Sequence, residues 1–175
     1  MKTFNLKSNE LGGQFANKHY FNGMGFTGEN QSPQLSWEHA PEGTKSFAVT
    51  LYDLDAPTGS GFWHWVVFNI PADVYELEAG AGEAGKKLLP PGAVQSNTDI
   101  GAPGYIGLAP NEGPAHRYLI TVHALDRKLE LEANTTPAFV GFTMHFATLA
   151  KASLLVYGQK QRSPAEMLTS RVLVG

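Results

Sequence analysis

The sequence has no cysteine among its 175 residues, so it can form no disulfide bond and offers no thiolate for catalysis. A zinc site would have to be built from histidine and carboxylate ligands alone. No apolar run approaches the roughly 18 residues needed to cross a bilayer, and the first ten residues lack the continuous apolar core of a signal peptide. These absences predict a soluble, cytoplasmic protein with no integral membrane association.

Positive charge is also sparse. The formal net charge is -3, and no run of Lys or Arg occurs in the sequence. The chain therefore lacks the basic surface with which proteins bind a nucleic-acid backbone or an anionic membrane. We expect no nucleic-acid partner, and we expect any bound anion to be held by a few local groups.

The common catalytic motifs are missing too. The segment Gly59-Ser-Gly61 lies in a turn and does not match the Gly-x-Ser-x-Gly pattern of a nucleophile elbow. Neither the His-Glu-x-x-His spacing of zinc hydrolases nor the Gly-x-x-x-x-Gly-Lys-[Ser/Thr] loop that cradles phosphates is present. We expect no cofactor, no metal site and no enzymatic activity.

The composition is that of a globular protein, with 42% hydrophobic and 17% charged residues. A chain of 175 residues is most simply one domain, here residues 1–175, with a sizeable core. The 19 Gly and 11 Pro residues disfavour a helical bundle, because both residues weaken helices and mark turns. The sequence therefore predicts a mainly β protein of short strands joined by loops.

Three strand-like runs each carry polar side chains at one end of an apolar face. Residues two apart on a strand point the same way, which defines the face of each run. The faces are Phe47, Val49, Leu51, Asp53 and Asp55 in the first run, His64, Val66, Phe68 and Ile70 in the second, and His116, Tyr118, Ile120 and Val122 in the third. If the three strands share one sheet, these polar groups converge. Trp63 and Trp65 fall on the opposite face and are expected to serve packing.

The converging groups have the chemistry of an anion site. A carboxylate close to an imidazole favours the protonated ring, so Asp53 could hold a histidine as a cation. His64 and His116 would then bind an anion, with Tyr118 as a neutral donor. The alternative for either histidine is a core position in which a backbone carbonyl satisfies the ring. For Asp55, capping of backbone N–H groups in a turn is an equally good interpretation.

Other segments surround these runs. Alternation at Phe4 and Leu6 predicts an edge strand, and a second short strand is expected at 34–37. A third is expected over 125–134. The Gly- and Pro-rich region 79–114 is unusually long for a loop, so it either lines a binding site or is a solvated connector.

A helix is predicted to follow. Thr136 and Pro137 form a helix start, and aromatic and apolar residues recur at helical spacing up to Tyr157, so we expect an amphipathic helix of about five turns ending at Gly158. The stripe comprises Phe139, Phe142, Phe146, Leu149, Ser153 and Tyr157. His145 beside it is expected to be a surface residue. The tail 159–175 is expected to carry a short helix at 164–168.

Taken together, the motifs resemble the phosphatidylethanolamine-binding proteins. They are Asp53-Leu-Asp-Ala-Pro57, His64-Trp-Val-Val-Phe-Asn69, Tyr105-Ile-Gly107 through Pro110, and His116-Arg-Tyr118. Flanking segments such as 32–37 and 59–64 look like the bacterial Raf-kinase-inhibitor-like branch of that family. The resemblance runs from about Asn22 to Tyr157. It implies a two-sheet antiparallel β-sandwich with Greek-key connections and peripheral helices.

The resemblance also implies a small surface pocket for phosphate, acetate or phosphorylated headgroups. Residue by residue, it assigns Asp53, Asp55, His64, His116 and Tyr118 to this pocket, with Pro110 in its wall. Three positions depart from the family's usual motifs, each with another residue in place of a proline: Leu54 in the first motif, and Leu108 and Asn111 in the wall segment. These departures leave the ionisable set complete but predict a less rigid wall.

The leading hypothesis is a binding protein for a small anionic or phosphorylated ligand, with a possible regulatory or inhibitory role towards kinases or other protein partners. One alternative is a hydrolase that uses the histidines and aspartates as acid and base. Another is an interaction module with a vestigial pocket. The chain is expected to be a monomer or a homodimer.

Overall fold

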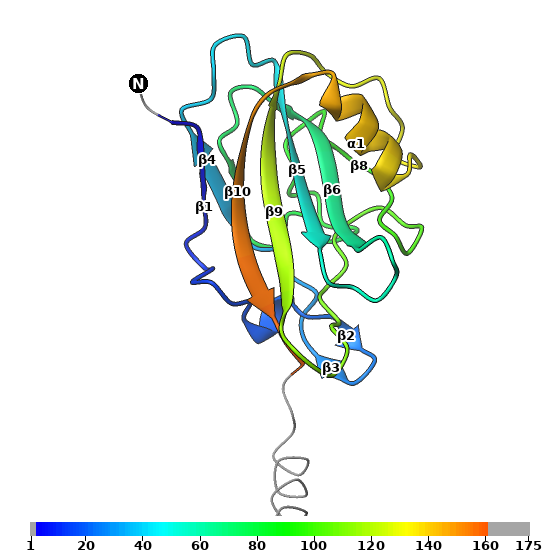
Figure 1. The fold of residues 1–175 in the computed structure, drawn as a ribbon. Coiled ribbons are helices and arrows are strands. Elements are labelled where there is room, and N and C mark those ends of the chain that lie inside the picture. Colours follow the sequence, from blue (N-terminus) through cyan, green and yellow to red (C-terminus); the bar gives the residue numbers. More distant parts are fainter. Residues whose placement is uncertain (1–2, 161–175) are drawn as a thin grey trace, which may run out of the picture.

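The computed structural model describes residues 3–160, which form two antiparallel sheets packed face to face (Figure 1). The large sheet has the order β10 (Thr148–Gly158), β9 (His116–Leu125), β5 (Ser46–Asp53), β6 (Phe62–Pro71), β8 (Val94–Gln95). The small sheet has the order β1 (Asn5–Lys7), β4 (Leu35–Glu38), β7 (Glu76–Leu77). The fold also contains a hairpin of β2 (Asn22–Gly23) and β3 (Phe26–Thr27), the 3-10 helix η1 (Asn17–His19) and helix α1 (Pro137–His145). The predicted mainly β, antiparallel architecture is confirmed.

The main core lies between the two sheets. The small sheet contributes Leu35 and Trp37, and the large sheet contributes Phe47, Leu51 and Ile120, all almost fully buried. The edge strand expected near Leu6 is β1, and the strand expected at 34–37 is β4. Alternating apolar residues therefore position the sheets as the sequence predicts.

A second, smaller core lies on the other face of the large sheet, under α1. It contains Ala48, Val66 and Phe68 from the sheet and Val140 and Met144 from the helix. Helix α1 lies at one end of the large sheet, and the β2–β3 hairpin lies at the opposite end (Figure 1).

A bulge in β6 corrects the predicted faces of that strand. Leu51 pairs with Trp65, but the next residue of β5, Tyr52, pairs with Trp63, so His64 is an extra residue in the ladder. His64 and Trp65 therefore both lie on the main-core side, whereas Val66 joins the core under α1. The expectation that Trp65 lies opposite His64 was wrong, because strict alternation fails across a bulge.

The long predicted helix was also wrong in its second half. Helix α1 ends at His145, and residues 148–158 form β10, which pairs with β9 along its length. Alternate residues of β10 are exposed, the pattern of a strand with one solvated face. Pairing with β9 supplies hydrogen-bond partners for the backbone N–H and C=O groups of this segment. This tertiary pairing outweighs the helical spacing of its apolar residues.

Two further predictions concern the segment after β9 and the end of α1. No separate strand forms over 125–134, because β9 ends at Leu125 and Leu129 packs under α1. His145 is exposed, as predicted. The predicted helix at 164–168 lies outside the described residues. Within residues 3–160, no helix has the length and apolar character required to cross a membrane.

Candidate functional site

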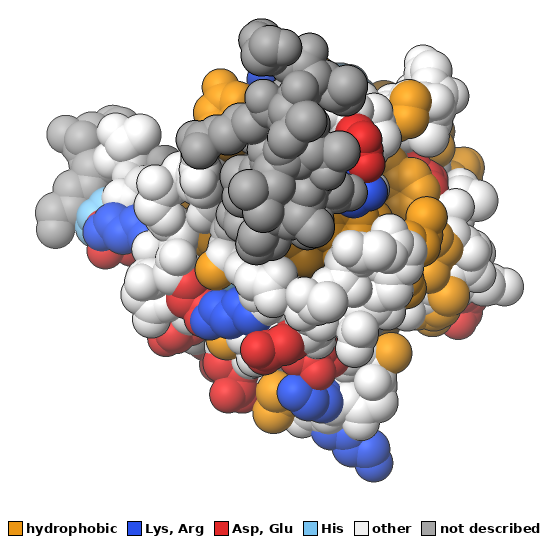
Figure 2. Space-filling model, turned by 90° about the horizontal axis from the view of Figure 1, so that it is seen from below, with side chains coloured by type: hydrophobic (Ala, Val, Ile, Leu, Met, Phe, Trp, Pro, Cys, Tyr) orange, Lys and Arg blue, Asp and Glu red, His pale blue; other side chains and the backbone are white. Residues whose placement is uncertain are grey.

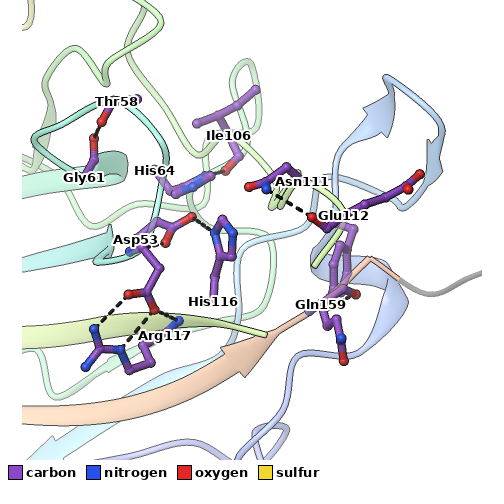
Figure 3. Close-up of polar contacts among 12 residues, drawn as sticks. Asp53, Thr58, Gly61, His64, Ile106, Asn111, Glu112, His116, Arg117 and Gln159 are labelled. Carbon is purple, nitrogen blue, oxygen red and sulfur yellow. Dashed lines mark hydrogen bonds and ion pairs between the residues drawn. The ribbon is translucent and has the colours of Figure 1, made fainter. Parts of the chain in front are cut away.

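The site lies at the end of the large sheet near the β2–β3 hairpin. Asp53 ends β5, and in the sheet register it faces Phe62 on β6 and Tyr118 on β9. His64 and His116 therefore stand on the two strands that flank Asp53. The sequence prediction that these three polar side chains converge at one end of the sheet agrees with this arrangement (Figure 3).

Asp53 and His116 form a buried pair. His116 Nδ1 lies 2.8 Å from Asp53 Oδ2, and both side chains are less than a tenth exposed. The second Asp53 oxygen accepts a hydrogen bond from the Asp55 backbone N–H at 2.9 Å. The carboxylate thus fixes Nδ1 as the protonated nitrogen of His116 and leaves Nε2 for a ligand.

His64 is held in the same way by a different acceptor. Its Nδ1 donates to the backbone carbonyl of Ile106 at 2.9 Å, and its ring packs against Phe62 at 4.8 Å between centroids. Burial lowers the pKa of His64, and the bond to Ile106 and the negative charge of Asp53 oppose that shift. The neutral ring is therefore favoured, and within residues 3–160 its hydrogen bond is made by Nδ1 and not by Nε2.

Asp55 has a different role from Asp53. Its carboxylate accepts hydrogen bonds from Arg117, one from the backbone N–H at 2.7 Å and two from the guanidinium at 2.8 and 3.0 Å. These bonds lower the pKa of Asp55 to about 2. Figure 3 shows Arg117 turned away from the two histidines. Through these bonds Asp55 links the end of β5 to the start of β9, and it lies outside the cavity lining.

Tyr118 lies behind the histidines. Its ring centroid is 5.5 Å from that of His64 and 6.3 Å from that of His116, and its side chain is fully buried. Its hydroxyl finds no hydrogen-bond partner within the described part of the chain. Burial, with a smaller contribution from nearby Asp53, raises the pKa of Tyr118. The structure therefore places Tyr118 as a packing platform for both rings.

The histidines open into a cavity of about 400 Å³, a size typical of small-molecule sites. Its lining is mostly apolar. The lining residues are Phe21, Met24, Asp53, Ala56, Pro57, Thr58, Phe62, His64, Ile100, Ile106, Gly107, Ala109, Asn111 and His116. The apolar members come from Phe62 on β6, from Phe21 and the β2–β3 hairpin that follows it, and from loops around residues 56–58 and 100–111. Sequence reasoning missed these residues, although the length and glycine content of region 79–114 signalled a loop with a structural task.

The wall segment is held by backbone contacts. Gly107 donates its N–H to Asn30 Oδ1 at 2.6 Å, and a Cβ on Gly107 would lie only 2.5 Å from the backbone nitrogen of Phe21. Leu108 is fully buried and its N–H bonds the carbonyl of His19 at 3.2 Å, an interaction that proline could not make. Pro110 is buried beside the lining residues Ala109 and Asn111.

The departure at Leu54 has an explanation comparable to that for Leu108. Its backbone N–H donates to the carbonyl of Arg117 at 2.9 Å, a β5–β9 bond that a proline at this position would remove. The side chain of Leu54 is partly exposed and lies outside the cavity lining. No group of three or more potential metal ligands occurs within residues 3–160.

Comparisons with known proteins identify the family of this chain. Residues 10–158 match the family model described as phosphatidylethanolamine-binding protein. The chain is 51% identical over 152 residues to the UPF0098 protein YbhB of Escherichia coli, which covers 85% of this chain and 96% of that protein. It is also 46% identical over 155 residues to YbcL of the same organism, covering 86% of this chain and 85% of that protein.

Solved structures show the same fold. The crystal structure of E. coli YbcL, described as a new member of the mammalian PEBP family, superposes with a TM-score of 0.87 at 44% identity, covering 90% of this chain and 99% of that one. A putative PEBP homologue from Chlamydia trachomatis, CT736, gives a TM-score of 0.76 at 27% identity, with 90% and 98% covered. The chain therefore belongs to the phosphatidylethanolamine-binding protein family.

Proposed function

We propose that this protein binds a small anionic or phosphorylated group in the cavity, on Nε2 of His64 and His116. The observation that carries the proposal is the matched orientation of the two rings. In each ring Nδ1 is engaged by a fixed acceptor, Asp53 or the Ile106 carbonyl, while the ring itself lines the cavity. A ligand that meets these histidines therefore meets their Nε2 atoms.

Binding of an anion should weaken as the pH rises. An imidazole Nε2 donates a hydrogen bond to an oxyanion only when the ring carries both protons. Because burial lowers the pKa of His64, this ring takes up its second proton less readily than a free imidazole, from acidic solution or from the ligand itself. Either source of the proton disappears in alkaline solution.

A second candidate function is hydrolysis, which the buried Asp53–His116 pair favours. A carboxylate that orients a histidine is the arrangement of a general base. A side-chain nucleophile beside it is harder to find, because the hydroxyl of Thr58 donates to the carbonyl of Gly61. We therefore propose a binding role in preference to catalysis. This role includes regulation of a kinase or another protein partner.

The decisive measurement is a calorimetric titration with inorganic phosphate and with phosphoethanolamine at pH 6 and pH 8. We expect binding at pH 6, weaker binding at pH 8, and a loss of at least tenfold in affinity in His116→Ala. His123→Leu is the matched control, because His123 is buried on the same strand but lies on the opposite face. Circular dichroism would show that both variants are folded.

Two results would redirect the proposal. Lack of binding for both anions at both pH values would remove its main support and favour a protein partner. Multiple turnovers on a panel of phosphate and carboxylate esters, abolished in His116→Ala, would favour the hydrolase. Cell fractionation would test the cytoplasmic location that the sequence predicts.

A further inference from the structure

The cavity is much larger than the anion that the histidines could hold. Its volume is about 400 Å³. With about 30 Å³ per non-hydrogen atom, the share of liquid volume taken by one water molecule, this space accommodates roughly a dozen such atoms. A phosphoryl group with its four oxygens has five atoms and a carboxylate three. More than half of the cavity therefore lies beyond the reach of a simple oxyanion.

The remaining space is apolar. The apolar lining includes Phe62, Pro57, Ile106, Met24 and Ile100. Met24 and Ile100 are respectively 80% and 55% exposed, unusually high for large apolar side chains that line a pocket. Figure 2, which looks onto this end of the molecule, shows hydrophobic side chains gathered around a hollow. Apolar surface of this kind next to convergent polar groups is typical of a ligand site.

The charge of the lining limits the charge of the ligand. Among the described residues that line the cavity there is no Lys or Arg, and the charged or titratable members are Asp53, His64 and His116. Asp99, which accepts a bond from the Trp63 N–H at 2.9 Å, adds a second carboxylate near His64. The histidines thus face two negative charges before a ligand arrives, and a dianion would be poorly compensated.

We propose that the cavity selects a monoanion that carries a compact apolar substituent of about the size of a phenyl ring. The inference rests on the proposed function, since the anionic end of the ligand occupies Nε2 of His64 and His116. The substituent then lies between Phe62 and the exposed pair Met24 and Ile100. Inorganic phosphate lacks the substituent, and the long chains of a diacyl lipid exceed the volume of the cavity several times.

Two pairs of probes separate the substituent from the anion. Inorganic phosphate is compared with phenyl phosphate, and acetate with phenylacetate, by calorimetry at pH 6, where a phosphate monoester is partly monoanionic. Burial of a ring on the apolar wall should make the phenyl member of each pair bind at least tenfold more tightly. Phosphoethanolamine, which has a polar substituent, should bind no more tightly than inorganic phosphate.

The double variant Met24→Ser/Ile100→Ser tests the wall directly. The ratio of the two affinities in each probe pair should fall to about threefold or less, because the apolar contact is lost. Leu155→Ser is the matched control, since Leu155 is an exposed apolar residue on β10 that does not line the cavity, and it should keep the full ratio. The readout is a ratio, so a general change in anion affinity does not affect it.

The outcomes distinguish the two proposals. Equal affinity within each pair, with binding that depends on His116, would overturn the apolar-monoanion inference and leave the anion site intact. Tighter binding of the phenyl probes that persists in the double variant would place the substituent elsewhere and also overturn it. If none of the four probes binds, the proposed function itself fails.

Discussion

The two ends of the large sheet use buried residues in different ways. At the β2–β3 end, the polar side chains of Asp53, His64 and His116 are buried, and each is tied to a specific partner beside a cavity. At the α1 end, an apolar cluster fills the space between helix and sheet, and no cavity-lining residue lies in it. Burial of polar groups is costly unless they are paired, so their concentration at one end marks the end where ligand chemistry is expected.

The same difference is visible along the single strand β9. His116 and His123 are both buried, but on opposite faces. His116 has Asp53 as its partner, whereas His123 Nδ1 has no hydrogen-bond partner within residues 3–160. Burial, helped by the positive charge of Lys151, lowers the pKa of His123 to about 4. His116 is therefore part of the candidate site, whereas the unpaired, buried His123 lowers the stability of the fold.

The largest expected effect on stability comes from replacing one glycine at each end of the large sheet by alanine. Gly107→Ala would force a Cβ to within 2.5 Å of the Phe21 backbone nitrogen, and backbone cannot move aside as a side chain can. We expect a loss of about 3 kcal/mol in the free energy of unfolding. Gly141→Ala in α1 has no atom within 4 Å of the new Cβ and should gain about 0.5–1 kcal/mol. Urea unfolding of both variants measures the difference.

A change of less than about 0.5 kcal/mol in Gly107→Ala would contradict the close packing of the cavity wall. A loss of stability in Gly141→Ala would contradict the open space found beside Gly141 on α1. The two variants thus test the packing of the wall and of the helix independently.

The next effect concerns pH and the unpartnered histidine. Unfolded His123 binds its proton near pH 6.5, but folded His123 resists protonation down to about pH 4. Between these values the unfolded state binds more protons, so stability falls as the pH falls. At pH 5 the loss is about 2 kcal/mol, because one pKa unit is worth about 1.4 kcal/mol.

His123→Leu should remove this loss. The difference in unfolding free energy between the variant and the wild type should therefore grow by about 2 kcal/mol when the pH is lowered from 7.5 to 5. His64 is common to both proteins, so its own titration cancels from the difference. Equal pH dependence in the two proteins would mean that His123 is solvated in the folded state.

Much of the site end could be predicted from the sequence. Alternation fixed which residues of β5 and β9 share a face, and neighbouring strands then brought Asp53, His64 and His116 together. The bulge at His64 could not be predicted, because one inserted residue is decided by pairing with β5 and leaves no mark in the β6 sequence itself. The apolar cavity wall was also missed, since it is assembled from loops distant in sequence.

The α1 end was predicted less well. Residues 137–157 fit a helical stripe, but the second half of the segment pairs with β9, which local sequence cannot reveal. Even within α1 the stripe was assigned to the wrong side. Val140 and Met144 face the sheet, while Phe139, Phe142 and Phe146 are 54–63% exposed. The sequence predicts that the aromatic side of the helix faces the sheet, because large apolar side chains are usually buried.

The smallest expected effect tests that reversed helix face. Phe142 is 61% exposed, so Phe142→Ala should change the free energy of unfolding by less than about 0.5 kcal/mol. The matched variant Val140→Ala removes two buried methyl groups from the core under α1 and should cost about 2 kcal/mol. Thermal or urea unfolding at low protein concentration gives both values. A cost for Phe142→Ala that appears only as the protein concentration rises would show that the exposed aromatic side of α1 is an interface between copies of the chain.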